Sequence, residues 1–127
     1  MRLGVLTLLL ALLSSGSALA VSNEELAGFS NHEYVEYARD RFEWLTGEGR
    51  SSHRLAKKFH HDCDLAAAPG ASSDSGRACE IAKAADEQVD QVLKEGQDLV
   101  AGLQKRLGHV PKWAQEAAAA LSEVAGR

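Results

Sequence analysis

Hydrophobic and small residues recur every three or four positions along most of the chain, which is the spacing of amphipathic α-helices. The most regular stretch runs from residue 75 to about residue 107, where these positions are separated alternately by four and three residues. This heptad pattern predicts one long helix of about 32 residues, roughly 48 Å in length. Its positions are Ala78, Ala82, Ala85, Val89, Val92, Gly96, Leu99 and Leu103.

The region before the long helix contains the start signals of three further helical segments. Ser22 with Glu25, and Ser30 with Glu33, each form a capping-box pattern between apolar residues. These patterns predict a short first turn and then a helix from Asn31. The apolar residues of that helix are Val35, Ala38, Phe42 and Leu45, and Gly47 is expected to end it.

A second helix is expected to begin at Ser51 or Ser52 and to end at the Pro69-Gly70 pair. Its apolar face comprises Leu55, Phe59, Cys63 and Ala66. The segment 69–76 is rich in Ser and Gly and has no periodicity, so it is predicted to be a surface loop.

The end of the chain predicts one more helix. Gly108 is suited to end the long helix, and Pro111 is suited to the first turn of the next. That last helix has an apolar stripe of Trp113, Ala117, Leu121 and Val124. Gly96 leaves two alternatives open: the long helix bends there, or another helix approaches it closely.

These elements predict an all-α protein, a small four- to five-helix bundle around the long helix at about 75–107. No alternating run of β-branched residues is long enough to indicate a strand. The two preceding helices are expected to cover the first half of the long helix, with their aromatic rings against its alanines. The last helix would cover the second half.

Residues 1–20 have the pattern of a secretory signal peptide. Arg2 precedes an apolar run of about eleven residues, and Ala18-Leu19-Ala20 forms a cleavage site. We therefore expect a secreted, extracellular protein with a single helical domain at residues 21–127. An apolar run this short does not span a bilayer.

Charge and cysteine content limit the classes of function that the chain can have. The segment after residue 20 contains 13 Lys and Arg against 18 Asp and Glu, and this acidic balance disfavours nucleic-acid binding. In an oxidising compartment the two cysteines, Cys63 and Cys79, are expected to form a disulfide. In the chain-entropy model such a bridge contributes roughly 3 kcal/mol to stability.

Positive charge is concentrated in one segment of this acidic chain. No acidic residue occurs from position 50 to position 61, and Lys57-Lys58-Phe59-His60 fits a loose heparin-binding pattern if His counts as basic. The cluster is predicted to be an electrostatic binding patch, with an ordinary solvated helix face as the alternative. Its residues are Arg50, His53, Arg54, Lys57, Lys58, His60 and His61.

The sequence does not nominate a catalytic or metal centre. His61 and Asp62 are adjacent, and adjacent residues on a helix point about 100° apart. No set of four zinc ligands is present, and no cofactor motif occurs. We therefore expect no enzyme activity, no metal and no cofactor.

Two functions follow as hypotheses. The first is a secreted inhibitor or ligand, as in saliva, venom or seminal fluid, which occludes the surface of an extracellular protein or a polyanion such as a sulfated glycan. The alternative is an extracellular carrier that holds a small apolar ligand or lipid among its aromatic residues. Self-association through an uncovered part of the heptad pattern is a further possibility.

Overall fold

The computed structural model describes residues 21–66 and 75–127, and every regular element in these ranges is an α-helix. The described residues divide into two units, with the boundary between Tyr34 and Val35. The all-α prediction is confirmed for the described residues. The predicted signal segment and most of the predicted loop at 69–76 lie outside them. The helices are α2 (Asn23–Ala27), α3 (Asn31–Ala66), α4 (Ser75–Leu107) and α5 (Lys112–Val124).

The first unit contains the two predicted helix starts, and both are confirmed. The Ser22 hydroxyl accepts a hydrogen bond from the Glu25 amide at 3.2 Å at the start of α2. Before α3, the Ser30 amide donates to the Glu33 carboxylate at 2.9 Å, and the Glu33 amide donates to the Ser30 hydroxyl at 3.1 Å. The hydrogen bonds from Ser30 hold the pKa of Glu33 below its ordinary value.

The second unit differs from the prediction in one main respect, because α3 is a single helix of 36 residues. The expected end at Gly47 and new start at Ser51 or Ser52 are wrong. Among the described residues only Gly108 and Gly126 have a positive φ, so neither Gly47 nor Gly49 adopts a left-handed helix-ending conformation.

Packing explains why α3 continues through its small residues. Gly49 and Ser52 are buried, and they continue a heptad pattern that starts at Ala38 and includes Phe42, Leu45 and Ala56. A Cβ atom at Gly49 would lie 3.3 Å from Leu121 Cδ1 and 3.4 Å from Val92 Cγ1. The small residues therefore let α4 and α5 approach α3, and this packing offsets the low helix propensity of glycine.

The long helix is confirmed as α4, and its predicted seam is buried from Ala82 to Leu103. The helix continues without interruption through Gly96. A Cβ atom at Gly96 would lie only 2.6 Å from Leu121 Cδ2. Of the two alternatives for Gly96, a bend or close approach by another helix, the structure therefore shows the close approach, by α5.

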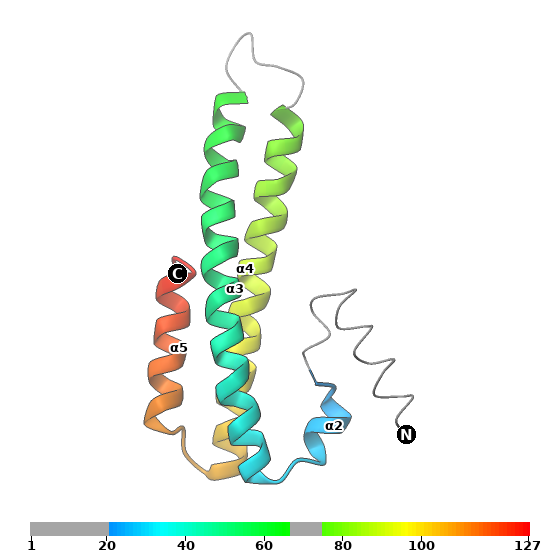
Figure 1. The fold of residues 1–127 in the computed structure, drawn as a ribbon, viewed down its shortest axis with the longest axis vertical. Helices are drawn as coiled ribbons and strands as arrows, with labels where there is room; N and C mark the ends of the chain where they lie inside the picture. The colour runs from blue at the N-terminus through cyan, green and yellow to red at the C-terminus, as the bar shows by residue number, and fades with distance from the viewer. Residues whose placement is uncertain (1–20, 67–74) are drawn as a thin grey trace. The chain divides into compact units, whose positions relative to one another are not determined.

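Helices α3 and α4 lie side by side and antiparallel, and α5 packs back along one half of them (Figure 1). The predicted disulfide, Cys63–Cys79, links α3 and α4 near the ends that segment 67–74 connects, with their Cα atoms 4.8 Å apart. The expected pair of short helices over the first half of the long helix is therefore wrong. The single helix α3 follows α4 instead.

The second unit has two regions, one in which α5 packs against α3 and α4 and one in which only α3 and α4 pack together. We call residues 35–53, 90–107 and 108–127 the base, and residues 54–66 and 75–89 the arm. In the base, Gly108 (φ +79°) ends α4, and α5 buries Ala114 and Leu121. At the C-terminal end of α5, Gly126 packs against His53 on α3 and Arg127 forms an ion pair with Asp90 on α4.

The aromatic residues also lie differently from the prediction. Phe42 is buried beside Gly96, in the second half of α4, and its ring meets that of Trp113 edge-on at 6.4 Å. Because α3 and α4 are antiparallel, Phe42 lies beside the second half of α4 and not beside the alanines of its first half.

Candidate functional site

The structure separates the seven residues of the predicted basic patch into two groups. Four of them follow one another along α3 at spacings of four, three and four residues, so they lie in one row on the helix surface. We call them the basic row. It is opposite the side of α3 that buries Ser52 and Ala56. Its members, Arg50, Arg54, Lys57 and His61, are all exposed.

The basic row lacks counter-charges within the described part of the chain. Among the residues that the structure describes, no hydrogen bond or ion pair involves any of its four side chains. From Arg50 to His61 the row spans eleven residue steps, which is about 16 Å along a helix. Its positive potential is therefore directed at solvent and available to an incoming anionic surface.

The other three patch residues are engaged within the protein. His60 Nε2 lies 2.6 Å from Asp86 Oδ2 on α4. Lys58 Nζ lies 3.4 Å from Asp62 Oδ2, and it also lies 4.7 Å from the centre of the Phe59 ring. These contacts hold the side chains in place and reduce their share of the outward positive field.

His53 is half-buried against the C-terminus of the chain. Gly126 has a φ of +75°, and a Cβ atom there would overlap the His53 imidazole ring. The amides of Gly126 and Arg127 donate to the carbonyls of Glu123 and Ser122 at 3.1 and 3.0 Å, which is the Schellman pattern of a helix end. His53 is therefore part of the packing that fixes α5.

The C-terminal residue adds a link to the second long helix. Arg127 Nη1 lies 2.5 Å from Asp90 Oδ1 on α4. The end of α5 thus contacts α3 through Gly126 and α4 through Arg127, at the boundary between base and arm. The basic row begins at this boundary and continues onto the arm.

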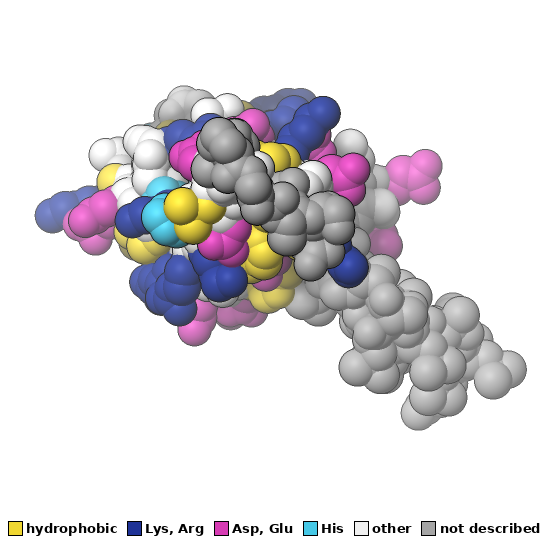
Figure 2. Space-filling model, turned by 90° about the horizontal axis from the view of Figure 1, so that it is seen from above, with side chains coloured by type: hydrophobic (Ala, Val, Ile, Leu, Met, Phe, Trp, Pro, Cys, Tyr) yellow, Lys and Arg dark blue, Asp and Glu magenta, His cyan; other side chains and the backbone are white. Residues whose placement is uncertain are grey.

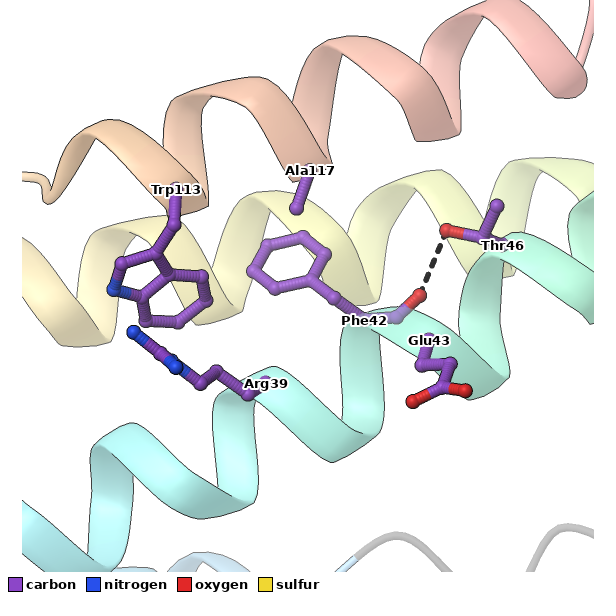
Figure 3. Close-up of a pocket in the computed structure, with 6 residues that line it drawn as sticks. All are labelled: Arg39, Phe42, Glu43, Thr46, Trp113 and Ala117. Atoms are coloured by element: carbon purple, nitrogen blue, oxygen red, sulfur yellow. Dashed lines mark hydrogen bonds between the residues drawn. The ribbon is translucent and has the colours of Figure 1, made fainter.

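A shallow pocket of about 340 Å³ lies between α3 and α5 (Figure 3). The guanidinium of Arg39 lies 4.8 Å from the centre of the Trp113 ring, and Phe42 forms the inner wall. The Thr46 hydroxyl donates to the Phe42 carbonyl at 2.8 Å. Glu43 and Ala117 complete the lining. Of the chain's seven aromatic residues, two line this pocket, namely Phe42 and Trp113. The carrier hypothesis expected more of the aromatic residues to line one cavity.

An ion pair that sequence reasoning missed joins the two long helices in the base. Arg41 is only 5% exposed and donates to both carboxylate oxygens of Glu95, with Nη2 2.8 Å from Oε1. Its guanidinium also lies 4.2 Å from the centre of the Trp44 ring. Burial alone would lower the pKa of Arg41, but the hydrogen bonds and negative charge of Glu95 outweigh it and hold that pKa above its ordinary value.

The pairing had a signal in the sequence. Arg41 directly precedes the seam residue Phe42, and Glu95 directly precedes the seam residue Gly96. In antiparallel helices such flanking positions face one another. The pairing could be found only once α3 and α4 were known to be antiparallel and in this register.

Within residues 21–66 and 75–127, no group of three or more His, Cys, Asp or Glu side chains is arranged to hold a metal ion. None of the helices described is both long and apolar enough to cross a membrane. Comparison with protein-family models, curated proteins and solved structures gave no match.

Proposed function

We propose that the protein is a secreted, non-enzymatic helical bundle that docks on an acidic surface of another extracellular protein and occludes it. The basic row carries this proposal, because it is an exposed line of three cations and a histidine, without counter-charges among the described residues, on an otherwise acidic chain. Complementary charge accelerates association and fixes the orientation of the two partners. The buried packing of α3 beneath the row keeps its members in register.

The proposed secretion is supported by the pattern of residues 1–20 and by the Cys63–Cys79 disulfide, since disulfides persist in oxidising compartments. Expression of the full chain in a secreting cell tests it. We expect the protein in the medium with Val21 as its first residue, as read by N-terminal sequencing. Retention in the cell with an intact N-terminus would contradict export.

The docking role is tested with charge-reversed variants of the full chain. The test variant is Arg54→Glu with Lys57→Glu. The matched control is Lys94→Glu with Lys112→Glu, which makes the same change in net charge at two exposed lysines outside the row. The probe is a synthetic helical peptide with glutamates at spacings of four, three and four residues.

We expect the association rate with this peptide to fall about tenfold or more in the test variant and less than about twofold in the control. Added salt should remove most of the difference. Equal rates for the wild type and the test variant at low salt would show that the basic row is not a docking site. Circular dichroism of both variants verifies that helix content is unchanged.

The carrier function remains the alternative. Its best location is the pocket of Figure 3, which lies at the lower end of the usual size range of small-molecule sites. Displacement of a hydrophobic fluorescent probe by a fatty acid, at one molecule per chain, would support the carrier. We prefer docking because this pocket is shallow, whereas all four side chains of the basic row are exposed.

A further inference from the structure

Two large hydrophobic side chains on the arm are exposed to solvent. Leu55 is 44% exposed and Leu65 is 59% exposed, and they are the only large hydrophobic residues in this class among the described residues. Single exposed leucines are common on protein surfaces. The position of these two relative to the basic row is what makes them informative.

The two leucines belong to a second row on α3. Leu55, Lys58, Asp62 and Leu65 follow one another at spacings of three, four and three residues, so they lie along one line of the helix. We call this line the leucine row. Leu65 is four residues after His61 and is therefore its neighbour on the helix surface. The leucine row thus runs alongside the basic row.

The middle of the leucine row is nearly neutral. Lys58 and Asp62 form an ion pair at 3.4 Å, and Lys58 also lies over the Phe59 ring. The two apolar ends are ten residue steps apart, which is about 15 Å along the helix. Figure 2 looks down on the end of the arm where α3 ends and α4 begins, and it shows hydrophobic side chains beside histidine, with Lys and Arg side chains nearby.

We infer that the partner of the basic row is a folded protein whose acidic surface is flanked by two apolar contact sites about 15 Å apart, one for Leu55 and one for Leu65. This inference rests on the proposed docking function and specifies the partner. The partner needs an acidic surface because the basic row has no counter-charge among the residues that the structure describes. The exposed leucines require apolar groups of the partner beside that acidic surface.

The leucine row favours a protein as the partner over a polysaccharide or a membrane. A sulfated polysaccharide would satisfy the cations but would leave both leucines in water. A membrane-binding helix needs a continuous apolar face, whereas the Lys58–Asp62 ion pair separates these leucines. Separate apolar sites on a protein surface can contact the two leucines and leave the ion pair between them exposed.

The two rows have different kinetic roles in such a complex. Long-range attraction to the basic row raises the association rate. Burial of the leucines acts only after contact, so it lowers the dissociation rate. The arm presents both rows with little loss of freedom on binding, because Ala56 is buried beneath them and the disulfide ties α3 to α4.

Two synthetic helical peptides test the inference with the full chain. Both carry the same row of glutamates. One also carries two leucines ten residues apart beside that row, and the other carries serines at the same two places. We expect the wild type to bind the leucine peptide about tenfold more tightly or better, mainly through slower dissociation.

The variant Leu55→Ser with Leu65→Ser should bind the two peptides equally and keep its salt-dependent association. The matched control, Ala101→Ser with Ala119→Ser, makes two exposed positions outside the arm more polar and should retain the wild-type preference. Both leucines are substantially exposed, so helix content and thermal midpoint should remain close to the wild type.

Equal affinity of the wild type for both peptides would overturn the inference. If association still depended on Arg54 and Lys57, the docking proposal would stand without the leucines. Absence of binding to either peptide at low salt would overturn the docking proposal itself. Leucine-dependent binding to vesicles of phosphatidylserine and phosphatidylcholine, without preference between the peptides, would assign the row to a membrane surface and also overturn the inference.

Discussion

The base and the arm use the same two helices but are stabilised differently. In the base, α5 packs against α3 and α4, and the buried residues include large ones such as Leu45, Leu99, Leu103 and Leu121. In the arm only two helices are present, and the buried residues are small, namely Ala56, Ala82, Ala85 and Val89. Each buried methylene contributes about 0.8 kcal/mol, so the base has much more hydrophobic stabilisation.

The arm compensates for its small core with a covalent link near its end, and it carries most of the basic row and both exposed leucines. Its surface can therefore serve binding while the base supplies stability. This division explains why the exposed leucines and the unpaired cations are tolerated. It also makes the two regions respond differently to substitution.

The largest expected difference comes from replacing one leucine in each region with alanine. Leu45→Ala should lower the free energy of unfolding by about 2–5 kcal/mol, because Leu45 is 1% exposed and its loss leaves a cavity. Leu55→Ala in the arm should cost less than about 1 kcal/mol. Urea denaturation followed by circular dichroism measures both. Equal losses would show that the arm is packed as tightly as the base.

Removal of the disulfide should affect the arm before the base. The variant with Cys63→Ser and Cys79→Ser loses up to roughly 3 kcal/mol of stabilisation in the chain-entropy model. Amide hydrogen exchange should accelerate strongly in residues 54–66 and 75–89 and much less in residues 90–107. A reducing agent should reproduce the pattern in the wild type and change nothing in the variant. Uniform acceleration in both regions would contradict a separate arm.

Sequence periodicity predicted the elements whose signals are local. The long helix and the two helix starts were predicted from neighbouring residues, and the disulfide from the two cysteines of a chain expected to be exported. The structure confirms the helices and the disulfide. The continuity of α3 was missed because a glycine within a helix and a glycine ending one look alike in sequence. What distinguishes them is the packing of Gly49 against Leu121, more than seventy residues away.

Prediction of the candidate site from the sequence was limited in the same way. Composition located all seven cationic and histidine side chains on one segment. It could not separate the exposed basic row from His60 and His53, because their contacts, Asp86 and Gly126, are distant in sequence. The leucine row was missed because Leu55 was assigned to the core of a separate helix.

Glycine-to-alanine substitutions provide the finest test of the continuous α3 and of the close packing in the base. No atom lies within 4 Å of a Cβ placed at Gly47, so Gly47→Ala should raise the free energy of unfolding by about 0.5–1 kcal/mol through helix propensity. Gly96→Ala should lower it by about 1–3 kcal/mol, because the new methyl group displaces Leu121.

Thermal and urea denaturation of the two variants, beside the wild type, measures these opposite signs. A helix that ended at Gly47 with a positive φ would instead lose stability in Gly47→Ala, since alanine is strained in that conformation. Destabilisation by Gly47→Ala would therefore indicate that α3 is broken into two shorter helices at Gly47. It would also place the basic row on a separate helix and remove the rigid link between the arm and the base.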